Sequence, residues 1–188
     1  MRKTGVIHGR FQPFHNDHLK YVLEGLKHVN LLYIGITNPD PSLTLDDKAD
    51  VKRSEAFANP CTFFERLQMI RNSLNDLNVE PNRYIIVPFP INIPRLWRYY
   101  APRDATYFLT IYDEWGERKL QLLTENGLKV RVLWRKSQAE KGITATEIRD
   151  CIIHDTKWVH LVPKGTVNVI KEFLIAKRLK EIHKARET

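Results

Sequence analysis

The sequence has few of the features that mark secreted and membrane proteins. Its two cysteines, Cys61 and Cys151, lie far apart and do not form a metal-type pair. We therefore expect a reducing compartment and no disulfide. No stretch reaches the roughly 18 apolar residues of a membrane-spanning helix. The opening MRKTGVIHGR lacks the apolar run of a secretory signal. These absences predict a cytoplasmic protein that does not partner with a membrane.

Blocks of like charge, internal repeats and a domain boundary are also absent. The 188 residues carry a formal charge of +8, spread along the chain except in the closing KRLKEIHKARET. Such a balance indicates an anionic partner, either nucleic acid or a phosphorylated small molecule. No groove-reading motif is present, so we expect only weak binding to nucleic acid. With 43% hydrophobic residues, the chain can bury one core, and we expect a single domain over residues 1–188.

Short apolar runs alternate with amphipathic stretches along the chain. The runs predict strands over residues 4–9, 30–37, 83–90, 105–112 and 128–134, and the amphipathic stretches predict helices over residues 16–29, 62–77, 113–127, 144–155 and 163–185. Strands alternating with helices predict an α/β protein with an open, doubly wound parallel sheet of the Rossmann-like kind. The closing helices, about residues 144–184, are expected to pack on the same core.

Two features refine this outline. Thr62 with Glu65 three residues later forms a capping box, which predicts the start of a helix. A polar segment of about residues 38–60 has prolines but no periodicity. It is too long for a simple connection, and we expect it to act as a lid.

The stretch GRFQPFHNDH, residues 9–18, concentrates hydrogen-bonding groups directly after the first predicted strand. Ligands of doubly wound sheets bind beyond the carboxyl ends of the strands, and a helix N-terminus offers N–H groups suited to phosphate. Gly9 lets the backbone approach a ligand closely. His15 and His18 share a helix face and can donate hydrogen bonds to phosphate. They could also be two of the ligands of a metal ion, but no third ligand is near them in the sequence.

Acidic residues in two places do not fit a simple phosphate site. At a separation of about 4 Å and an effective dielectric of about 20, Asp17 would repel a phosphate by roughly 4 kcal/mol. It must therefore point outward, cap the helix or meet Mg²⁺. We expect it to cap the helix and to point away from the phosphates. Asp113 and Glu114 either cap the next helix or recognise a cationic group or ribose hydroxyls.

Several motifs carry a family resemblance. GRFQPFHNDH resembles the G-x-F-x-P-x-H-x-G-H signature of the HIGH-motif nucleotidyltransferase superfamily, except that Asp17 stands where the signature has glycine. ITATEIR, residues 143–149, resembles that superfamily's second signature, [IY]-S-[ST]-T-x-x-R. The segments NPCTFFERLQMI, YIIVPFPINIPRLW and WVHLVPKGTVNVI are similar to parts of the archaeal-type nicotinamide-mononucleotide adenylyltransferases. The resemblance covers most of the chain but fails at residues 40–58 and is poor at TIYDEWGERK.

This resemblance implies an adenylyltransferase that joins ATP and nicotinamide mononucleotide into NAD and pyrophosphate, a step of NAD biosynthesis. A related transferase that uses CTP, or another phosphate or phosphonate acceptor, stays open as an alternative. A nucleotide-binding regulator without turnover is a third hypothesis. In all three a nucleoside triphosphate is the partner, and a homo-oligomer is compatible with the sequence.

The resemblance also implies roles for individual residues. His15, His18 and Arg149 would be catalytic, binding the triphosphate and stabilising its developing charge. The nucleotide-binding residues would be Gly9, Arg10, Phe11, Gln12, Ile143, Thr144 and Thr146. Trp97 would stack on the nicotinamide ring and Asn92 would bond its amide. We expect Mg²⁺ to be held mainly by substrate phosphates and water, with no metal site of the protein's own.

Overall fold

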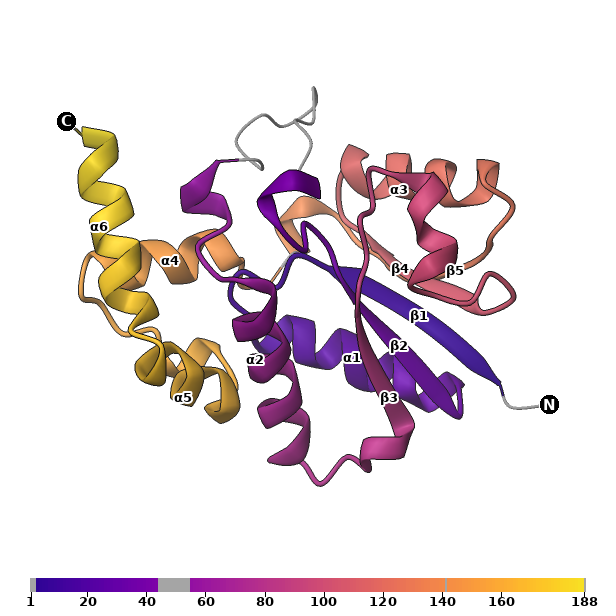
Figure 1. Cartoon of the computed structure of the whole chain (residues 1–188), viewed down its shortest axis with the longest axis horizontal. Coiled ribbons are helices and arrows are strands. Elements are labelled where there is room, and N and C mark those ends of the chain that lie inside the picture. Colours follow the sequence, from indigo (N-terminus) through magenta and orange to yellow (C-terminus); the bar gives the residue numbers. More distant parts are fainter. Residues whose placement is uncertain (1–2, 44–54, 141, 188) are drawn as a thin grey trace.

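The computed structural model describes residues 3–43, 55–140 and 142–187. Its centre is a five-stranded sheet in the order β3-β2-β1-β4-β5, and every pair of neighbouring strands is parallel (Figure 1). The strands are β1 Thr4–Gly9, β2 Leu31–Ile36, β3 Tyr84–Pro88, β4 Thr106–Ile111 and β5 Lys129–Arg135. The chain builds β1, β2 and β3 outward on one side and then returns to place β4 and β5 on the other. The predicted open parallel α/β sheet is thereby confirmed, and its strand order reverses beside β1.

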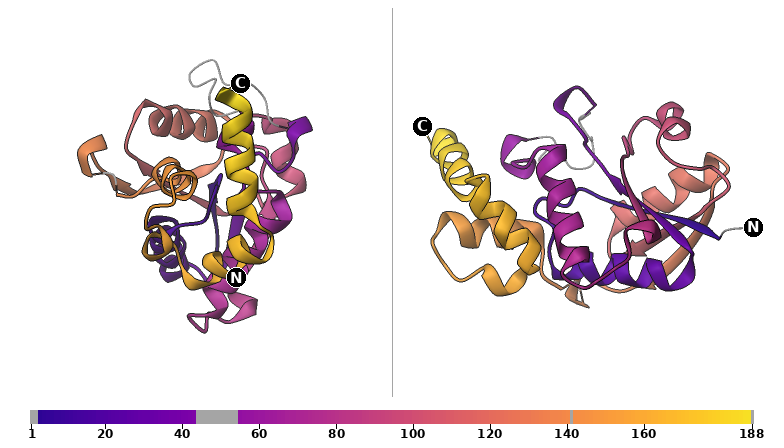
Figure 2. Two further views of the ribbon diagram at one scale, coloured as in Figure 1. Left: turned by 90° about the vertical axis from the view of Figure 1, so that its left-hand side faces the viewer. Right: turned by 60° about the horizontal axis from the view of Figure 1, so that its bottom comes forward.

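Six α-helices surround the sheet in the described part of the chain. They are α1 Asn16–His28, α2 Phe63–Asn75, α3 Glu114–Glu125, α4 Ala145–Ile153, α5 Lys164–Glu172 and α6 Ile175–Glu187. In Figure 1, α3 lies above the strands, and α1 runs behind them at the level of β2 and β3. Figure 2 shows α4, α5 and α6 gathered at one end of the molecule, beside α2. Among the described helices, none is long and apolar enough to cross a membrane.

The alternation of side chains along the strands divides the core into two clusters. Ile7 of β1 faces a large cluster with apolar residues of α1, α2, α4, α5 and α6. Val6 faces a smaller cluster that includes Leu123 of α3 and Trp97 of the 3₁₀ segment Pro94–Tyr99. Successive residues of a strand point to opposite faces. His8 therefore lies on the face of Val6, toward α3.

One predicted feature of the helices is confirmed and another is wrong. The capping box at the start of α2 is present: the Thr62 hydroxyl accepts from the Glu65 N–H at 3.2 Å, and the Glu65 carboxylate accepts from the Thr62 N–H at 2.8 Å. The single closing helix predicted over residues 163–185 is wrong. It is two helices, separated by Leu174 with a left-handed φ of 52°.

The break between α5 and α6 has a tertiary cause. It carries no glycine or proline, so the sequence has no local stop signal there. The change of direction brings Arg178 of α6 to Glu65 of α2, with both guanidinium–carboxylate distances at 2.8 Å. Residues 44–54 of the predicted lid, about residues 38–60, lie outside the described residues, and its action as a lid stays a prediction. Its described ends include short 3₁₀ turns at Pro41–Leu43 and Ala56–Ala58.

Candidate functional site

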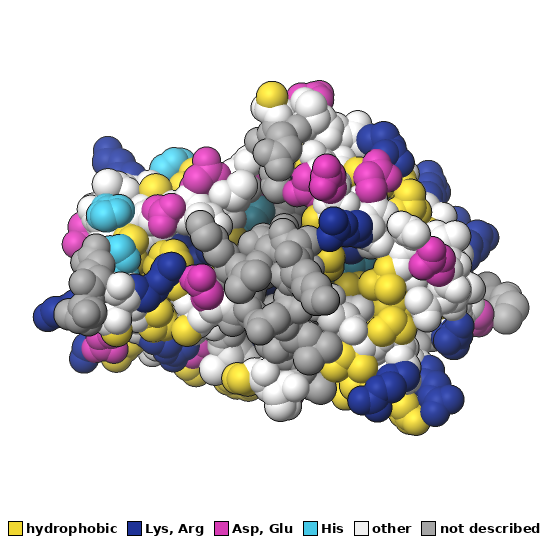
Figure 3. Space-filling model, turned by 90° about the horizontal axis from the view of Figure 1, so that it is seen from above, with side chains coloured by type: hydrophobic (Ala, Val, Ile, Leu, Met, Phe, Trp, Pro, Cys, Tyr) yellow, Lys and Arg dark blue, Asp and Glu magenta, His cyan; other side chains and the backbone are white. Residues whose placement is uncertain are grey.

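A cavity of about 400 Å³ opens at the carboxyl ends of β1, β2 and β4, where the strand order reverses. This is the position at which doubly wound sheets bind ligands. Figure 3 shows histidine side chains within the hollow on this face of the molecule. The cavity is lined by residues 8–12, 15, 17, 18, 21, 37, 38, 91, 92, 110, 112, 113, 115, 119 and 142–146.

The loop between β1 and α1 forms the floor of the cavity through its backbone. Phe11 is fully buried and has a left-handed φ of 54°, which is uncommon for a residue with a side chain. A Cβ at Gly9 would lie 2.7 Å from the Phe11 ring, so only glycine fits there. The Gln12 amide pairs with the backbone of Cys61, donating at 2.9 Å and accepting at 2.8 Å. Gln12 and Phe11 thus fix the loop with their side chains, and the backbone remains to face a ligand.

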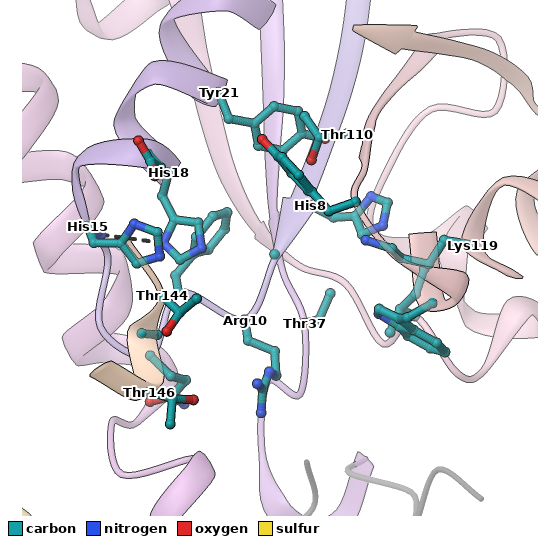
Figure 4. Close-up of a pocket in the computed structure, with 18 of the residues that line it drawn as sticks. His8, Arg10, His15, His18, Tyr21, Thr37, Thr110, Lys119, Thr144 and Thr146 are labelled. Carbon is teal, nitrogen blue, oxygen red and sulfur yellow. Dashed lines mark hydrogen bonds between the residues drawn. The ribbon is translucent and has the colours of Figure 1, made fainter. Parts of the chain in front are cut away.

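His15 and His18 lie face to face at the start of α1 (Figure 4). Their ring centroids are 3.5 Å apart, and the backbone N–H of His15 points to Nδ1 of His18 at 3.4 Å. Burial lowers the pKa of His15 to about 4, although Asp17 and Glu147 oppose the shift. Burial, together with His15 and Arg10, lowers the pKa of His18 well below its ordinary value. Both imidazoles are therefore neutral at pH 7, and they can offer hydrogen bonds but not full charges to a phosphate.

The N-terminus of α4 opens into the same cavity as that of α1. Thr144 is the N-cap, and its hydroxyl accepts from the Glu147 N–H at 3.2 Å. Figure 4 places Thr144 and Thr146 next to the histidine pair. The fold therefore brings together the two motifs that stand some 125 residues apart in the sequence, residues 9–18 and 143–149. Two helix N-termini directed at one cavity make a site suited to an anion.

Arg149 does not reach the cavity lining. Its side chain is buried, and it donates to the carbonyl of Gln12 at 2.7 Å and to the hydroxyl of Thr146 at 3.1 Å. Its guanidinium also lies over the ring of Phe57 at 5.3 Å. In this structure Arg149 braces the loop after β1 against α4. These bonds use two of the five guanidinium N–H donors, and Nε has no hydrogen-bond partner among the described residues. The predicted contact of Arg149 with phosphate oxygens therefore stays a prediction.

Asp17 does not cap the helix, and the expectation that it points away from the site is wrong. The N-cap is His15, whose capping box with His18 already occupies the helix start. The Asp17 carboxylate lines the cavity instead, where it accepts from Lys20 Nζ at 3.0 Å. A Cβ at Gly142 would overlap this carboxylate, so Asp17 also lies against the segment leading into α4.

The end of the cavity opposite the histidine pair is built by β1, β4 and α3. His8, Thr110 and Lys119 lie there (Figure 4). Sequence reasoning missed His8 and Lys119. The available signal was a histidine within the buried apolar run TGVIHG. Asp113 lines the cavity and caps α3 by accepting from the Gly116 N–H at 3.0 Å, as one of the two alternatives for it predicted.

The two predicted acceptor-binding residues are separated by the fold. Asn92 lines the cavity. Trp97 lies in the smaller core cluster, 1% exposed, with its ring stacked on Phe89 at 5.6 Å and its indole N–H donated to the carbonyl of Pro90 at 3.0 Å. A ring so enclosed has no face to offer a ligand. The role of Trp97 is thus corrected from ligand stacking to core packing.

Within residues 3–43, 55–140 and 142–187, no group of three or more His, Cys, Asp and Glu side chains is gathered in a way that could hold a metal ion. Asp17 and Asp113 are the carboxylates that line the cavity, and they come from different elements.

Comparison with known proteins places this geometry among nucleotide-transferring enzymes. Residues 6–151 match the family described as cytidylyltransferase-like. The chain is 43% identical, over 94% of its length and 95% of the relative, to a phosphonoformate cytidylyltransferase of Streptomyces viridochromogenes. It is 34% identical to a nicotinamide-nucleotide adenylyltransferase of Thermococcus sibiricus, over 94% of this chain and 87% of that protein. It is 31% identical to the enzyme of the same name from Saccharolobus solfataricus, with 95% of both chains covered.

A solved structure shares the fold. This is a bifunctional NMN adenylyltransferase/ADP ribose pyrophosphatase from Francisella tularensis, complexed with AMP and a manganese ion, with a TM-score of 0.68 at 18% identity. The likeness covers 96% of this chain but only 52% of that protein, so this chain spans about half its length.

Proposed function

The chain belongs to the cytidylyltransferase-like family of nucleotidyltransferases, and we propose that it transfers a cytidylyl group from CTP to a small phosphonate, with release of pyrophosphate. The observation that carries this proposal is the 43% identity to phosphonoformate cytidylyltransferase across nearly the whole chain, against 34% and 31% for the two adenylyltransferases. The adenylyl transfer to nicotinamide mononucleotide that the sequence motifs favoured becomes the second candidate.

The position of Trp97 supports this order of candidates. A nicotinamide acceptor was expected to stack on this ring, and the ring is enclosed in the core. Asn92 remains in the cavity lining and favours keeping nicotinamide mononucleotide as a candidate. Tyr112 and Trp115 also line the cavity and offer aromatic surface to a base or a ring.

In the proposed reaction, a phosphonate oxygen attacks the α-phosphorus of CTP and forms a new P–O bond. The bond from the α-phosphorus to the bridging oxygen breaks, and its electron pair leaves with pyrophosphate. Such a step needs positioning and charge neutralisation more than covalent help from the protein. The neutral imidazoles of His15 and His18, the N–H groups at the starts of α1 and α4, and the charge of Arg10 supply them.

Mg²⁺ enters the proposal bound to the triphosphate. It would neutralise phosphate charge and polarise the phosphorus centre. Among the described residues, the lining carboxylates Asp17 and Asp113 are not part of a gathered ligand cluster. Phosphate oxygens and water would then supply most of the coordination of Mg²⁺.

The test is a panel of four nucleoside triphosphates against phosphonoformate, methylphosphonate, nicotinamide mononucleotide and nicotinate mononucleotide, scored by pyrophosphate release. We expect CTP with phosphonoformate to have a kcat/KM at least about tenfold above any other pair, a difference of roughly 1.4 kcal/mol in transition-state binding. A preference for ATP with nicotinamide mononucleotide would overturn the proposal in favour of the second candidate. A lack of pyrophosphate release from every pair would point to a nucleotide-binding regulator.

A further inference from the structure

His8 is a buried polar side chain that faces the cavity and has no hydrogen-bond partner in the part of the chain that the structure describes. Its side chain is 6% exposed at the carboxyl end of the central strand β1. Neither ring nitrogen has a hydrogen-bond partner among the residues that the structure describes. Gly35 is its partner on β2, and a Cβ there would lie 2.7 Å from Phe89 Cβ and 3.3 Å from His8 Cβ, so the surroundings of His8 are closely packed.

The cost of this arrangement indicates a ligand. Burial, with the nearby charge of Lys119, lowers the pKa of His8 to about 3. The ring is therefore neutral at pH 7 and carries one N–H donor and one acceptor nitrogen. Leaving a buried polar group unpaired destabilises the folded protein. An apolar side chain at position 8 would avoid this cost, so the histidine is explained if a bound molecule completes its hydrogen bonds.

The chemistry of the surroundings identifies the group that fits. Lys119 lines the same end of the cavity (Figure 4), and it lies one helical turn from Trp115 on the cavity face of α3. An ammonium and an imidazole N–H together form a donor set for a single anionic oxygen group such as a carboxylate. The opposite end of the cavity, between the starts of α1 and α4, provides the helix N-termini for the phosphates. The end with His8 is therefore left for the part of the acceptor that does not react.

We infer that His8, with Lys119, binds the non-reacting carboxylate of the acceptor and selects acceptors that carry one. This inference rests on the proposed nucleotidyl transfer and adds to it the specificity of the acceptor subsite. Phosphonoformate carries both a phosphonate and a carboxylate, whereas methylphosphonate has no carboxylate. The same difference separates nicotinate mononucleotide from nicotinamide mononucleotide.

The experiment measures the ratio of kcat/KM for acceptors with and without the carboxylate in wild type, His8→Leu and His8→Gln. We expect His8→Leu to raise KM for phosphonoformate at least about tenfold, a loss within the range of one hydrogen bond to a charged group. KM for CTP and for methylphosphonate should stay within about twofold of wild type. His8→Gln keeps a donor and should recover part of the loss. The melting temperature of His8→Leu should rise, because an unpaired buried polar group has been removed.

The outcomes separate the inference from the proposed function. If the wild type uses only the two mononucleotides, the proposed function is wrong, and the same variants then test His8 through the nicotinate-to-nicotinamide ratio. The inference is overturned if His8→Leu leaves the ratio of kcat/KM between the two acceptors of a pair unchanged. This holds whether the variant affects neither acceptor or both equally, and whichever pair is used. A wild type that turns over no acceptor would overturn both.

Discussion

At the scale of single residues, burial decides what the cavity side chains can do. His8, His15 and His18 lie in enclosed positions that disfavour their charged forms. They act at pH 7 as directed hydrogen-bond donors and acceptors. Among the described residues, positive charge near a bound triphosphate can come from Arg10, which lines the cavity, and from the helix N-termini. The formal charge of +8 counts histidine as neutral, so the neutral state of the enclosed histidines leaves it unchanged.

His18→Ala tests the histidine pair. We expect kcat to fall by at least about a hundredfold, because a donor to the transferring phosphate is lost where charge develops. The change in melting temperature should be modest. Steady-state kinetics beside thermal unfolding would check this, with exposed His160→Ala as the matched control. Turnover near that of wild type in His18→Ala would remove His18 from catalysis.

The position of Asp17 in the cavity lining leads to a prediction about its partner Lys20. Its carboxylate lines the cavity and is paired to Lys20 at 3.0 Å. Removing the lysine would leave a negative charge that repels the triphosphate by up to roughly 4 kcal/mol before solvent screening. Because the pair is partly exposed, we expect Lys20→Ala to raise KM for the nucleoside triphosphate only about two- to fivefold.

The double variant distinguishes charge from structure. Asp17→Asn combined with Lys20→Ala should return KM close to the wild-type value, since the unpaired charge is gone, and the effect of Lys20→Ala should shrink at high salt. A larger loss in the double variant than in Lys20→Ala would instead show that the Asp17 carboxylate holds Mg²⁺ or the acceptor.

At the scale of elements, buried arginines fasten the loops that form the cavity. Arg66 of α2 is 1% exposed. Its guanidinium donates to four backbone carbonyls, those of Arg10 at 2.9 Å, Thr37 at 2.7 Å, Asn38 at 2.7 Å and Thr62 at 3.1 Å. The loops after β1 and β2 are therefore held together by one side chain from a helix that does not line the cavity. The planar fork of arginine suits this task, and an ammonium cannot reproduce it.

Arg66→Lys tests this fastening. Carbonyls left without a donor cost about 1–3 kcal/mol each, so we expect a loss of roughly 3 kcal/mol and a fall in melting temperature on the order of 6–12 °C. The activity should also fall, since the loop carrying Arg10 loosens. Arg71→Lys, an exposed position on the same helix, is the control for thermal unfolding. Equal melting temperatures for the two variants would contradict the role assigned to Arg66.

At the scale of the whole molecule, the enclosed histidines link stability to pH. The unfolded chain binds a proton at each histidine below about pH 6.5. The folded protein does so at His15 only near pH 4 and at His8 only near pH 3. Between these limits the unfolded state holds more protons, so the free energy of unfolding falls as the pH is lowered. The stability that neutral histidines contribute is fully present above pH 6.5.

His8→Leu isolates one part of this dependence. At pH 5 the wild type should have lost about 2 kcal/mol through His8 relative to neutral pH, and the variant should not show that part of the loss. Urea unfolding at pH 7 and pH 5 would measure it, with exposed His160→Leu as the control. An identical pH dependence in wild type and His8→Leu would show that His8 does not stay neutral in the folded protein.

Features that depend on neighbouring residues along the chain could be predicted from the sequence. Alternating apolar runs and helical periodicity are local patterns, so the parallel α/β class and the positions of the five strands followed from them. The capping box is likewise local, because it joins Thr62 to Glu65, which is three positions later in the chain. The two motifs at residues 9–18 and 143–149 could be placed at a common edge, because carboxyl ends of parallel strands meet there.

The directions in which individual side chains point could not be predicted, because they depend on contacts between distant elements. Trp97 is a core residue because its ring stacks on Phe89 and its indole N–H is donated to the carbonyl of Pro90. Arg149 became a brace because the carbonyl of Gln12, 137 residues away, accepts its hydrogen bond. Asp17 faces the cavity because His15 already caps α1. His8 is a candidate ligand-binding residue because β1 lies at the centre of the sheet and Lys119 of α3 lies close to its imidazole. Each of these outcomes depends on contacts between elements distant in the sequence, and no local pattern encodes them.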